Sequence, residues 1–356
     1  MPKLNVHWSK FNPYIHGRMS SWLEAEPSKL LQKPPLPKPE KIPKFPTMVF
    51  NPVKYATPKC KDTAVILVLF NPTKSYRIVQ NMLYVKHMLD EASIPYFIGE
   101  VATPGTIHTF SAKENIFLFS SNSVMFFKEN IINVVLNKPA VAAFSKYVIL
   151  DSDVIFSERA WLDGISKELD ICDVLQPYKF VNMLDISFMS TEAKISICSA
   201  ACVEKEHVSY SHTGYAWAFT RDWWEAHGGL YEYALIGSGD KCLAKQANLR
   251  VTIPKQYVGF EKFYTSAVPA KVSFLPYAIW HLYHGSFVNR QYVKRNDLII
   301  AGMAGAKIDV LENAVEKNAD GILQWKLPYR HIMNHVLLEY FKGRQDDGLE
   351  VHFVSK

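Results

Sequence analysis

The sequence predicts an α/β fold in which a mostly parallel sheet is flanked by helices, and two observations support this. Between residues 63 and 156, strand-like segments alternate with helix-like segments. The strand-like segments are continuous apolar runs, as in strands covered on both faces, and the segments between them carry apolar residues at helical spacing. Because right-handed crossovers between parallel strands place helices on both faces, we expect a doubly wound sheet.

The first predicted unit is a β-α-β unit. TAVILVLFNP (63–72) predicts a central strand that stops at an Asn-Pro turn. YRIVQNMLYVKHMLDEA (76–92) has the apolar spacing of a helix, and IPYFIGEVA (94–102) predicts the next strand. The pattern then repeats, with a helix predicted over SVMFFKENIINVVLNKP (123–139) and a strand over KYVILDSDVIF (146–156).

The two ends of the chain differ from this central part. KPPLPKPEKIPKFP (33–46) alternates Pro with Lys, which favours polyproline II structure and predicts an arm. NRQYVKRNDLIIAGMAG (289–305) and LPYRHIMNHVLLEYFKGR (327–344) predict two helices packed on the main domain. We therefore expect three parts, which are an N-terminal Pro/Lys-rich arm over 1–60, a main domain over 61–290 and a C-terminal helical extension over 291–356.

Composition argues against several classes of protein. The formal net charge is +6, but Lys and Arg are scattered, so we expect a phosphate-bearing small ligand and no nucleic-acid partner. The five cysteines are odd in number and form no C-x-x-C pair, which argues against a disulfide framework and a structural zinc site. No run of about 18 apolar residues is present, so we expect no integral membrane segment and a cytoplasmic protein.

Asp151 and Asp153 stand where the predicted strand 146–156 should be ending. In open α/β sheets, ligands bind outside the carboxyl ends of the strands. Two carboxylates one residue apart can hold Mg²⁺ or Mn²⁺ together with a diphosphate, since these cations prefer oxygen ligands. The alternative is a turn or helix cap with solvated acids.

A second chemistry shares this Asp-x-Asp pattern. Phosphatases of the haloacid dehalogenase type carry a nucleophilic Asp and an acid-base Asp at this spacing after an apolar strand. There the motif normally opens the fold, whereas two strand candidates and an arm precede it here. A Thr or Val also usually stands where this chain has Ile155.

The segment HTGYAWAFTRDWWEAHGGLYEYALIGSGDKCLA (212–244) mixes glycines with aromatic residues. Glycines such as Gly214 allow a backbone to approach a ligand closely. Asp240 comes directly before a helix-like stretch and could accept a proton from an incoming hydroxyl. The alternative is that Asp240 caps a helix beginning at Lys241.

A third polar segment is IWHLYHGSFVNRQYVKR (279–295). His281 or His284 could supply an imidazole to a metal that the Asp pair holds, although a single His is more often structural. Arg290, which follows them, is a cation able to face a diphosphate.

Taken in order, these three segments resemble those of GT-A glycosyltransferases, particularly the family-2-like and β-1,4-galactosyltransferase-like groups. ILDSDVIF (149–156) is similar to their Asp-x-Asp (DxD) strand, residues 212–240 to their acceptor-side segment, and WHLYHGSFVNR (280–290) to the late segment that returns a His to the metal. A further likeness to uncharacterised bacterial, phage and large-virus transferases of this class includes FNPTKSYR (70–77), FFKENIINVVL (126–136) and YFKGRQDDG (340–348).

The resemblance implies a GT-A, Rossmann-like catalytic domain over 61–290. It implies that Asp153, with His281 or His284, binds Mn²⁺ or Mg²⁺, and that Asp151 contacts the ribose or the metal shell. For a viral chain it would place the protein in the cytoplasm of the host cell.

The resemblance also assigns residues to the donor and to the acceptor. Asn71 and Arg77 would lie near the nucleotide base, and Lys128 and Asn130 would line the same donor cleft. Asp240 would be the general base. The sequence departs from the family pattern at Ser238, which stands near a position where a carboxylate often contacts a sugar.

These observations predict a metal-dependent glycosyltransferase that moves a hexosyl or pentosyl group from a UDP- or GDP-sugar to a hydroxyl of a glycan or other acceptor. Attack assisted by Asp240 would invert the anomeric carbon, but a retaining reaction is compatible with the same scaffold. Two alternatives stay open at this point. One is a phosphatase or nucleotidyltransferase that uses Asp151 and Asp153, and the other is a non-catalytic nucleotide-sugar-binding protein.

Overall fold

A computed structural model describes residues 50–203, 211–264, 269–292 and 294–348 of the protein. These residues belong to one structural unit, which spans Thr47–Lys356. The Pro/Lys-rich segment 33–46, predicted as an arm, lies outside the described residues, and the predicted boundary between main domain and extension at residue 290 stays a prediction.

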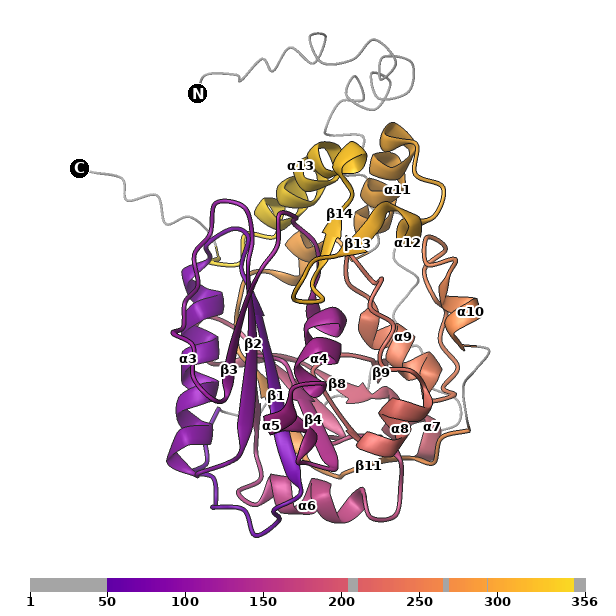
Figure 1. Ribbon diagram of the computed structural model, residues 1–356. Helices are drawn as coiled ribbons and strands as arrows, with labels where there is room; N and C mark the ends of the chain where they lie inside the picture. Colours follow the sequence, from indigo (N-terminus) through magenta and orange to yellow (C-terminus); the bar gives the residue numbers. More distant parts are fainter. Residues whose placement is uncertain (1–49, 204–210, 265–268, 293, 349–356) are drawn as a thin grey trace, which may run out of the picture. The chain divides into compact units, whose positions relative to one another are not determined.

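The described residues form a seven-stranded sheet, and it is mostly parallel as predicted (Figure 1). β1 pairs in parallel with β2 on one side and with β4 on the other, and β10 is antiparallel to both of its neighbours, β4 and β6. In the order of the sheet, the strands are β11 (Val272–Phe274), β6 (Val174–Gln176), β10 (Ala216–Thr220), β4 (Lys146–Leu150), β1 (Thr63–Phe70), β2 (Tyr96–Ala102) and β3 (Ile116–Ser120).

Helices cover both faces of this sheet, which is why its strands are apolar throughout. Side chains alternate along β1, so that Ile66 packs into one core with α4 (Lys128–Leu136). Leu67 packs into the other core with α3 (Tyr76–Glu91) and α6 (Trp161–Glu168). The doubly wound arrangement predicted from the sequence is therefore confirmed (Figure 1).

A second sheet of five strands begins where the predicted strand 146–156 breaks. The prediction of one continuous strand is wrong. The segment forms two strands in different sheets, with Asp151 to Asp153 between them. The break is stabilised by backbone hydrogen bonds, from Asp151 N to Tyr215 O at 2.9 Å and from Leu282 N to Asp153 O at 2.8 Å. In order, the second sheet consists of β5 (Val154–Phe156), β12 (Ala278–His281), β7 (Phe180–Leu184), β8 (Ser190–Ser196) and β9 (Ser211–His212).

The C-terminal part contains the two predicted helices, α11 (Lys294–Ala306) and α13 (Leu327–Gly343), and they pack against each other. Phe341 of α13 stacks on Phe126 with ring centroids 4.9 Å apart, and this contact joins the helix to the loop before α4. The C-terminal helices thus lie against the part of the chain that carries the seven-stranded sheet (Figure 1).

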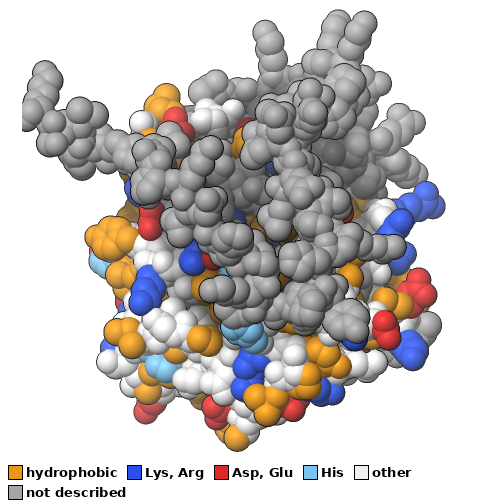
Figure 2. Space-filling model, turned by 90° about the horizontal axis from the view of Figure 1, so that it is seen from above, with side chains coloured by type: hydrophobic (Ala, Val, Ile, Leu, Met, Phe, Trp, Pro, Cys, Tyr) orange, Lys and Arg blue, Asp and Glu red, His pale blue; other side chains and the backbone are white. Residues whose placement is uncertain are grey.

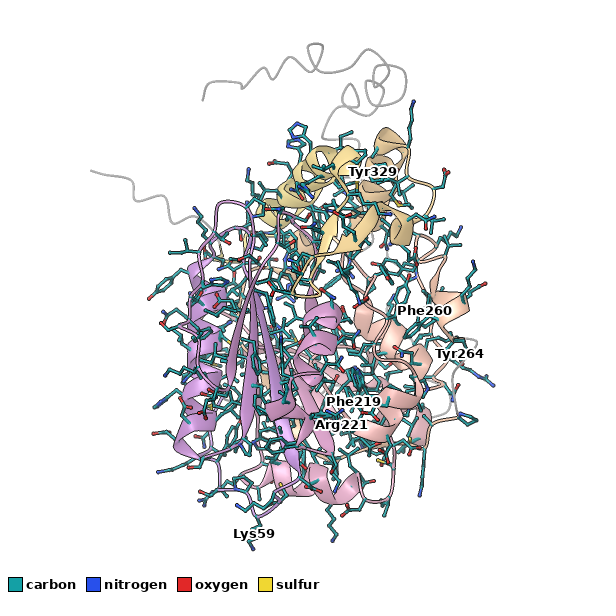
Figure 3. All side chains as sticks on the ribbon, in the orientation of Figure 1. Lys59, Phe219, Arg221, Phe260, Tyr264 and Tyr329 are labelled. Carbon is teal, nitrogen blue, oxygen red and sulfur yellow. The ribbon has the colours of Figure 1, made fainter. Side chains whose placement is uncertain are left out.

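Shorter elements connect these layers. Arg221, which Figure 3 labels, is the first residue of α8 (Arg221–Ala226). Its Nε donates to the Tyr147 hydroxyl at 2.9 Å and so ties the end of β10 to β4. The remaining elements are α5 (Pro139–Ala142), α7 (Ile197–Val203), α8 (Arg221–Ala226), α9 (Gly239–Gln246), α10 (Phe260–Tyr264), η3 (Phe287–Arg290), α12 (Leu311–Ala314), β13 (Val315–Lys317) and β14 (Leu323–Trp325).

On the face seen in Figure 2, Lys and Arg side chains lie among acidic, apolar and neutral groups. Within the described ranges, every helix is too short or too polar to cross a bilayer. All five cysteines are free thiols.

Candidate functional site

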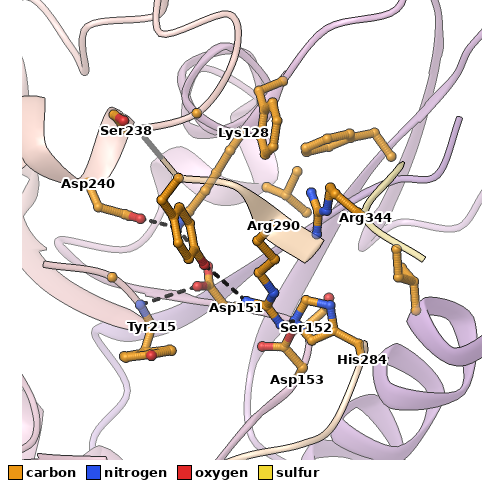
Figure 4. Close-up of a pocket in the computed structure, with 18 of the residues that line it drawn as sticks. Lys128, Asp151, Ser152, Asp153, Tyr215, Ser238, Asp240, His284, Arg290 and Arg344 are labelled. Carbon is orange, nitrogen blue, oxygen red and sulfur yellow. Dashed lines mark hydrogen bonds and ion pairs between the residues drawn. The ribbon is translucent and has the colours of Figure 1, made fainter. Parts of the chain in front are cut away.

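A cavity of about 400 Å³ lies at the carboxyl ends of β1 and β4. Its wall is completed by the first turns of α4 and α9, by the segment after β12 and by the C-terminal end of α13 (Figure 4). This is the edge of the sheet at which ligands bind in open α/β folds. Most of the residues that the sequence singled out line it.

Asp153, His281 and His284 come together on one side of the cavity. His284 Nε2 lies 2.8 Å from Asp153 Oδ2, and His281 Nε2 lies 3.6 Å from Asp153 Oδ1. Their potential ligand atoms all lie within 4.8 Å of one another. The antiparallel pairing of β5 with β12 produces this cluster, because it sets His281 opposite Val154, the residue after Asp153.

The chemistry of this cluster fits a divalent cation. Asp153 Oδ1 is buried and has no hydrogen-bond partner among the described residues, so it is an oxygen that a metal could ligate. One carboxylate and two imidazoles form a mixed oxygen and nitrogen donor set. The sequence had left open which histidine approaches the aspartate, and both do.

Asp153 and His281 have the protonation states that metal ligands need. Burial lowers the pKa of His281 well below its ordinary value, so this imidazole is neutral. Burial alone would raise the pKa of Asp153, but His281, His284 and Arg290 outweigh it and lower that pKa. At neutral pH the cluster therefore presents an ionised carboxylate and a neutral imidazole.

His284 is held from both sides. Its Nε2 lies 2.6 Å from Nη2 of Arg290 as well as near Asp153, and its Nδ1 lies 3.4 Å from Asp346 Oδ1. With a cation held between Asp153 and Nε2, the Asp346 carboxylate would favour the tautomer that carries its proton on Nδ1, which leaves Nε2 as the ligand atom. Arg344 donates from Nη2 to the same Asp346 oxygen at 3.0 Å.

A second group of charges lies across the cavity and is centred on Lys128, in the first turn of α4. Lys128 Nζ lies 2.6 Å from Asp151 Oδ1 and 2.8 Å from Asp240 Oδ1 (Figure 4). The backbone N–H of Tyr215 donates to the other Asp151 oxygen at 3.2 Å. Asp151 is thus turned toward Lys128 and is not part of the three-residue cluster around Asp153.

Burial raises the pKa of Asp151 to about 6, although Lys128 opposes this shift. Asp240 and Asp153 add to the increase, because like charges disfavour ionisation. Lys128 is therefore the cation that allows two neighbouring carboxylates to coexist here.

Asp240 lies in the first turn of α9, but it does not cap that helix. The N-cap is Ser238, and α9 begins at Gly239. The alternative that Asp240 caps a helix starting at Lys241 is therefore wrong, and its carboxylate faces Lys128 across the cavity. Gly214 explains how the loop before β10 comes so close, since a Cβ there would lie 3.1 Å from Asp240 Oδ2 and 2.9 Å from the His212 ring.

Three of the residues assigned to the donor do not line the cavity. Asn71 forms hydrogen bonds with the backbone of Ser75 at both ends of its amide, and the backbone N–H of Arg77 donates to Asp347 at 2.8 Å. Asn130 is fully buried, and its amide contacts Glu232 at 2.9 Å and the backbone of the β13–β14 hairpin. Their assignment to the donor stays a prediction.

Four further residues line the cavity although no sequence pattern singles them out: Glu129, Arg295, Arg344 and Asp346. Asp346 and Arg344 follow α13, almost 200 residues after the Asp pair, so no local pattern connects them to it. The segment 340–348 had been noted only as part of the family resemblance. Their proximity to His284 is a result of the tertiary fold.

No protein-family model matches the sequence, and the comparison with curated proteins found no match. Solved structures do match. A Drosophila β1,4-galactosyltransferase 7, in complex with manganese, UDP-Gal and xylobiose, is 13% identical over 55% of this chain, with a TM-score of 0.32. This chain spans 66% of the length of that enzyme.

Two other matches are bacterial. A protein described as a nucleotide-diphospho-sugar transferase, from Desulfovibrio desulfuricans, is 9% identical over 82% of this chain and 100% of its own, with a TM-score of 0.32. Glucosyl-3-phosphoglycerate synthase from Mycobacterium tuberculosis is 9% identical over 71% of this chain and 80% of its own, with a TM-score of 0.34. These proteins belong to the class that the sequence motifs resemble, but at such identities the likeness does not determine what this chain binds.

Proposed function

We propose that the protein is a metal-dependent glycosyltransferase that uses a nucleotide-diphosphate sugar. The observation that supports this most directly is the cluster of Asp153, His281 and His284 beside the guanidinium of Arg290, at the carboxyl ends of the sheet. A cation site next to a buried Arg suits a diphosphate, which needs more than one positive partner to be bound and to leave.

Asp153, His281 and His284 would hold the cation, which would neutralise the charge that develops on the departing diphosphate. Two imidazoles favour Mn²⁺ over Mg²⁺, because Mg²⁺ prefers an all-oxygen shell. Arg290 would contact the same phosphates. His284 would be kept in its ligand tautomer by Asp346.

Asp240 would accept the proton of the acceptor hydroxyl as that oxygen attacks the anomeric carbon. Lys128, 2.8 Å away, stabilises the ionised carboxylate that this role requires. Attack from the Asp240 side, opposite a diphosphate bound at Asp153 and Arg290, would invert the anomeric carbon. Asp151 is paired with Lys128. If a charged substrate took its place at Lys128, Asp151 would be released and would contact the ribose of the donor.

The finer assignments are part of the same proposal. They are a hexosyl or pentosyl group as the transferred sugar, UDP or GDP as the nucleotide, a glycan or other hydroxyl acceptor, and a cytoplasmic reaction. Five free thiols are consistent with a reducing compartment.

The test is a panel of UDP- and GDP-sugars with Mn²⁺, followed by thermal stabilisation and by slow hydrolysis of the donor. We expect one donor to raise the melting temperature in a Mn²⁺-dependent way, and Asp153→Ala to remove both the shift and the hydrolysis. Asp320→Ala is a matched control, since Asp320 is exposed on the β13–β14 turn. A wild-type protein that responds to no donor would contradict the proposal.

The same panel separates the alternatives. A phosphatase would release inorganic phosphate, and a nucleotidyltransferase would exchange pyrophosphate. Asp151 as a phosphatase nucleophile would have to leave Lys128, and Asp153 as its acid-base partner would have to leave two imidazoles. Donor binding without any transfer or hydrolysis would indicate a non-catalytic binding protein.

A further inference from the structure

Arg295 is a buried cation that lines the cavity without a carboxylate partner. It is 8% exposed, and its Nη2 donates to the Ser238 hydroxyl at 2.7 Å. Its Nε is buried and has no acceptor among the described residues, and no described carboxylate forms an ion pair with it. The guanidinium also lies 4.9 Å from the centroid of the Tyr292 ring, which is a neutral group. A buried charge that contacts only neutral groups is expensive, so the guanidinium is better suited to an anion from outside.

The surrounding backbone increases the positive potential at this point. Arg295 lies in the first turn of α11, and Ser238 is the N-cap of α9, so two helix N-termini meet here. Ser238 has a left-handed backbone, with a φ of 73°, and its hydroxyl forms no capping hydrogen bond with α9 but accepts from Arg295. The first N–H groups of α9 are therefore without a side-chain cap and add their partial charge to that of the guanidinium.

The approach of Arg295 to this turn depends on a glycine. Gly237 has a φ of +91°, and a Cβ on it would lie 2.8 Å from Arg295 Nη1. Asn296, the next residue in α11, also lines the cavity, and its side-chain oxygen accepts from Gln256 at 2.7 Å. Its amide nitrogen is then the donor that it can offer to a ligand.

The acids nearby form no ion pair with Arg295. Glu129 packs against Gly239 at the start of α9, but no ion pair joins it to Arg295. Asp240, two residues after Ser238, forms its ion pair with Lys128 at 2.8 Å. Asp297 shares the first turn of α11 with Arg295, but no ion pair joins them. Arg290 belongs to the other side of the cavity, where it contacts His284.

We propose that Arg295 and the first turn of α9 bind a phosphate or carboxylate group of the acceptor, so that the acceptor is an acidic molecule. This inference rests on the proposed function. The acceptor is favoured over the donor because Ser238 and Asp240 lie on the same turn, across the cavity from Asp153 and His284 (Figure 4). An anion at Arg295 would therefore place its neighbouring hydroxyl next to the proposed base.

The test is a titration with inorganic phosphate by calorimetry, in the presence of saturating UDP and Mn²⁺. We expect the wild-type protein to bind phosphate while UDP is bound, and Arg295→Met to weaken this binding more than about tenfold. Arg295→Lys should retain part of it, and Arg250→Met, at an exposed position, should retain all of it. Affinity for UDP should be the same in all four proteins.

Three results would overturn the inference. Equal phosphate binding by wild type and Arg295→Met would show an adventitious ion only. Displacement of phosphate by UDP would assign Arg295 to the donor diphosphate instead. Loss of UDP affinity in Arg295→Met would do the same. If Arg295→Met does not fold, Ser238→Ala takes its place, because it removes the hydrogen-bond partner of the guanidinium. We expect Ser238→Ala to weaken phosphate binding as well, by a smaller factor, and to leave the affinity for UDP unchanged.

The outcome for the anion site can be separated from that for the function. If the wild-type protein binds neither UDP nor GDP, the glycosyltransferase proposal and the acidic acceptor both fail. The comparison of wild type with Arg295→Met in phosphate alone then still decides whether Arg295 is an anion site.

Discussion

The two sides of the cavity are built in different ways. On one side, Asp153, His281 and His284 are brought together by the pairing of β5 with β12; the two histidines are buried and Asp153 is half-buried. On the other side, Asp151, Asp240 and Lys128 come from the end of one strand and the first turns of two helices, and they are joined by ion pairs. Strand pairing fixes a geometry before any ligand binds, whereas an ion-pair network can exchange partners when a charged ligand enters. We infer that the first side binds the metal and that the second side responds to substrates.

The largest effect should come from breaking the metal side. Asp153→Asn should abolish Mn²⁺ binding measured by calorimetry, and donor hydrolysis should fall by more than about 100-fold, because no other described carboxylate belongs to the cluster. Asp151 is two residues before Asp153 in the sequence. The Asp151→Asn variant should bind Mn²⁺ with an affinity within a few-fold of that of the wild-type protein. Loss of Mn²⁺ binding in both variants would mean that the two sides are not separate.

A substitution on the side of the cavity that carries Asp240 should lower the rate of transfer and leave the binding of UDP and Mn²⁺ intact. Asp240→Asn should lower kcat for transfer by about 10² to 10⁴, the usual size of general-base catalysis, while the affinity for UDP and Mn²⁺ is retained. The measurement is transfer to an acceptor alongside UDP binding by calorimetry. A parallel loss of UDP affinity would place Asp240 in the donor site.

The contact between Asp346 and His284 gives a smaller effect on the metal side. Asp346→Asn should reduce Mn²⁺ affinity by about 10- to 100-fold, since a carboxylate behind a ligating imidazole orients the ring and increases its basicity. Asp347→Asn is the neighbouring control, because Asp347 contacts Ser75 and the start of α3 instead. Equal effects of the two variants would indicate a general role of the C-terminal segment.

The last prediction concerns Glu129, next to Lys128 in the sequence, and the dependence of the free energy of unfolding on pH. Burial raises the pKa of Glu129 from 4.5 to about 7, although Lys128 opposes the shift. As the pH rises from 4.5 to about 7, the unfolded chain releases this proton before the folded one does. The free energy of unfolding should therefore fall over that range, by up to about 3 kcal/mol.

Glu129→Gln should remove this component of the pH dependence, because the amide does not titrate. The measurement is urea unfolding of both proteins at several pH values between 4.5 and 8. Identical pH profiles for wild type and Glu129→Gln would show that Glu129 titrates normally.

Much of the fold follows from local patterns. The apolar runs of β1, β2 and β4 and the helical spacing of α3 identify buried parallel strands and their crossover, because burial on both faces demands uninterrupted apolar residues. The strand 146–156 was predicted as one piece and is two. The polar residues at 151–153 are compatible with a strand end or a break, and only the backbone partners at Tyr215 and Leu282 decide between them.

By itself, the sequence determined which residue types are available for chemistry and where they stand relative to strand ends. Asp151, Asp153, Asp240, His281 and His284 could be singled out because polar residues next to apolar runs are conspicuous, and all five line one cavity. Only the tertiary structure decided how they divide. It joined Asp153 to both histidines, turned Asp151 and Asp240 toward Lys128, and added Asp346 and Arg295 from the C-terminal part. The physical reason is that ion pairs and hydrogen bonds depend on distances of a few ångströms between residues far apart in the chain, and those distances are fixed by packing and strand pairing.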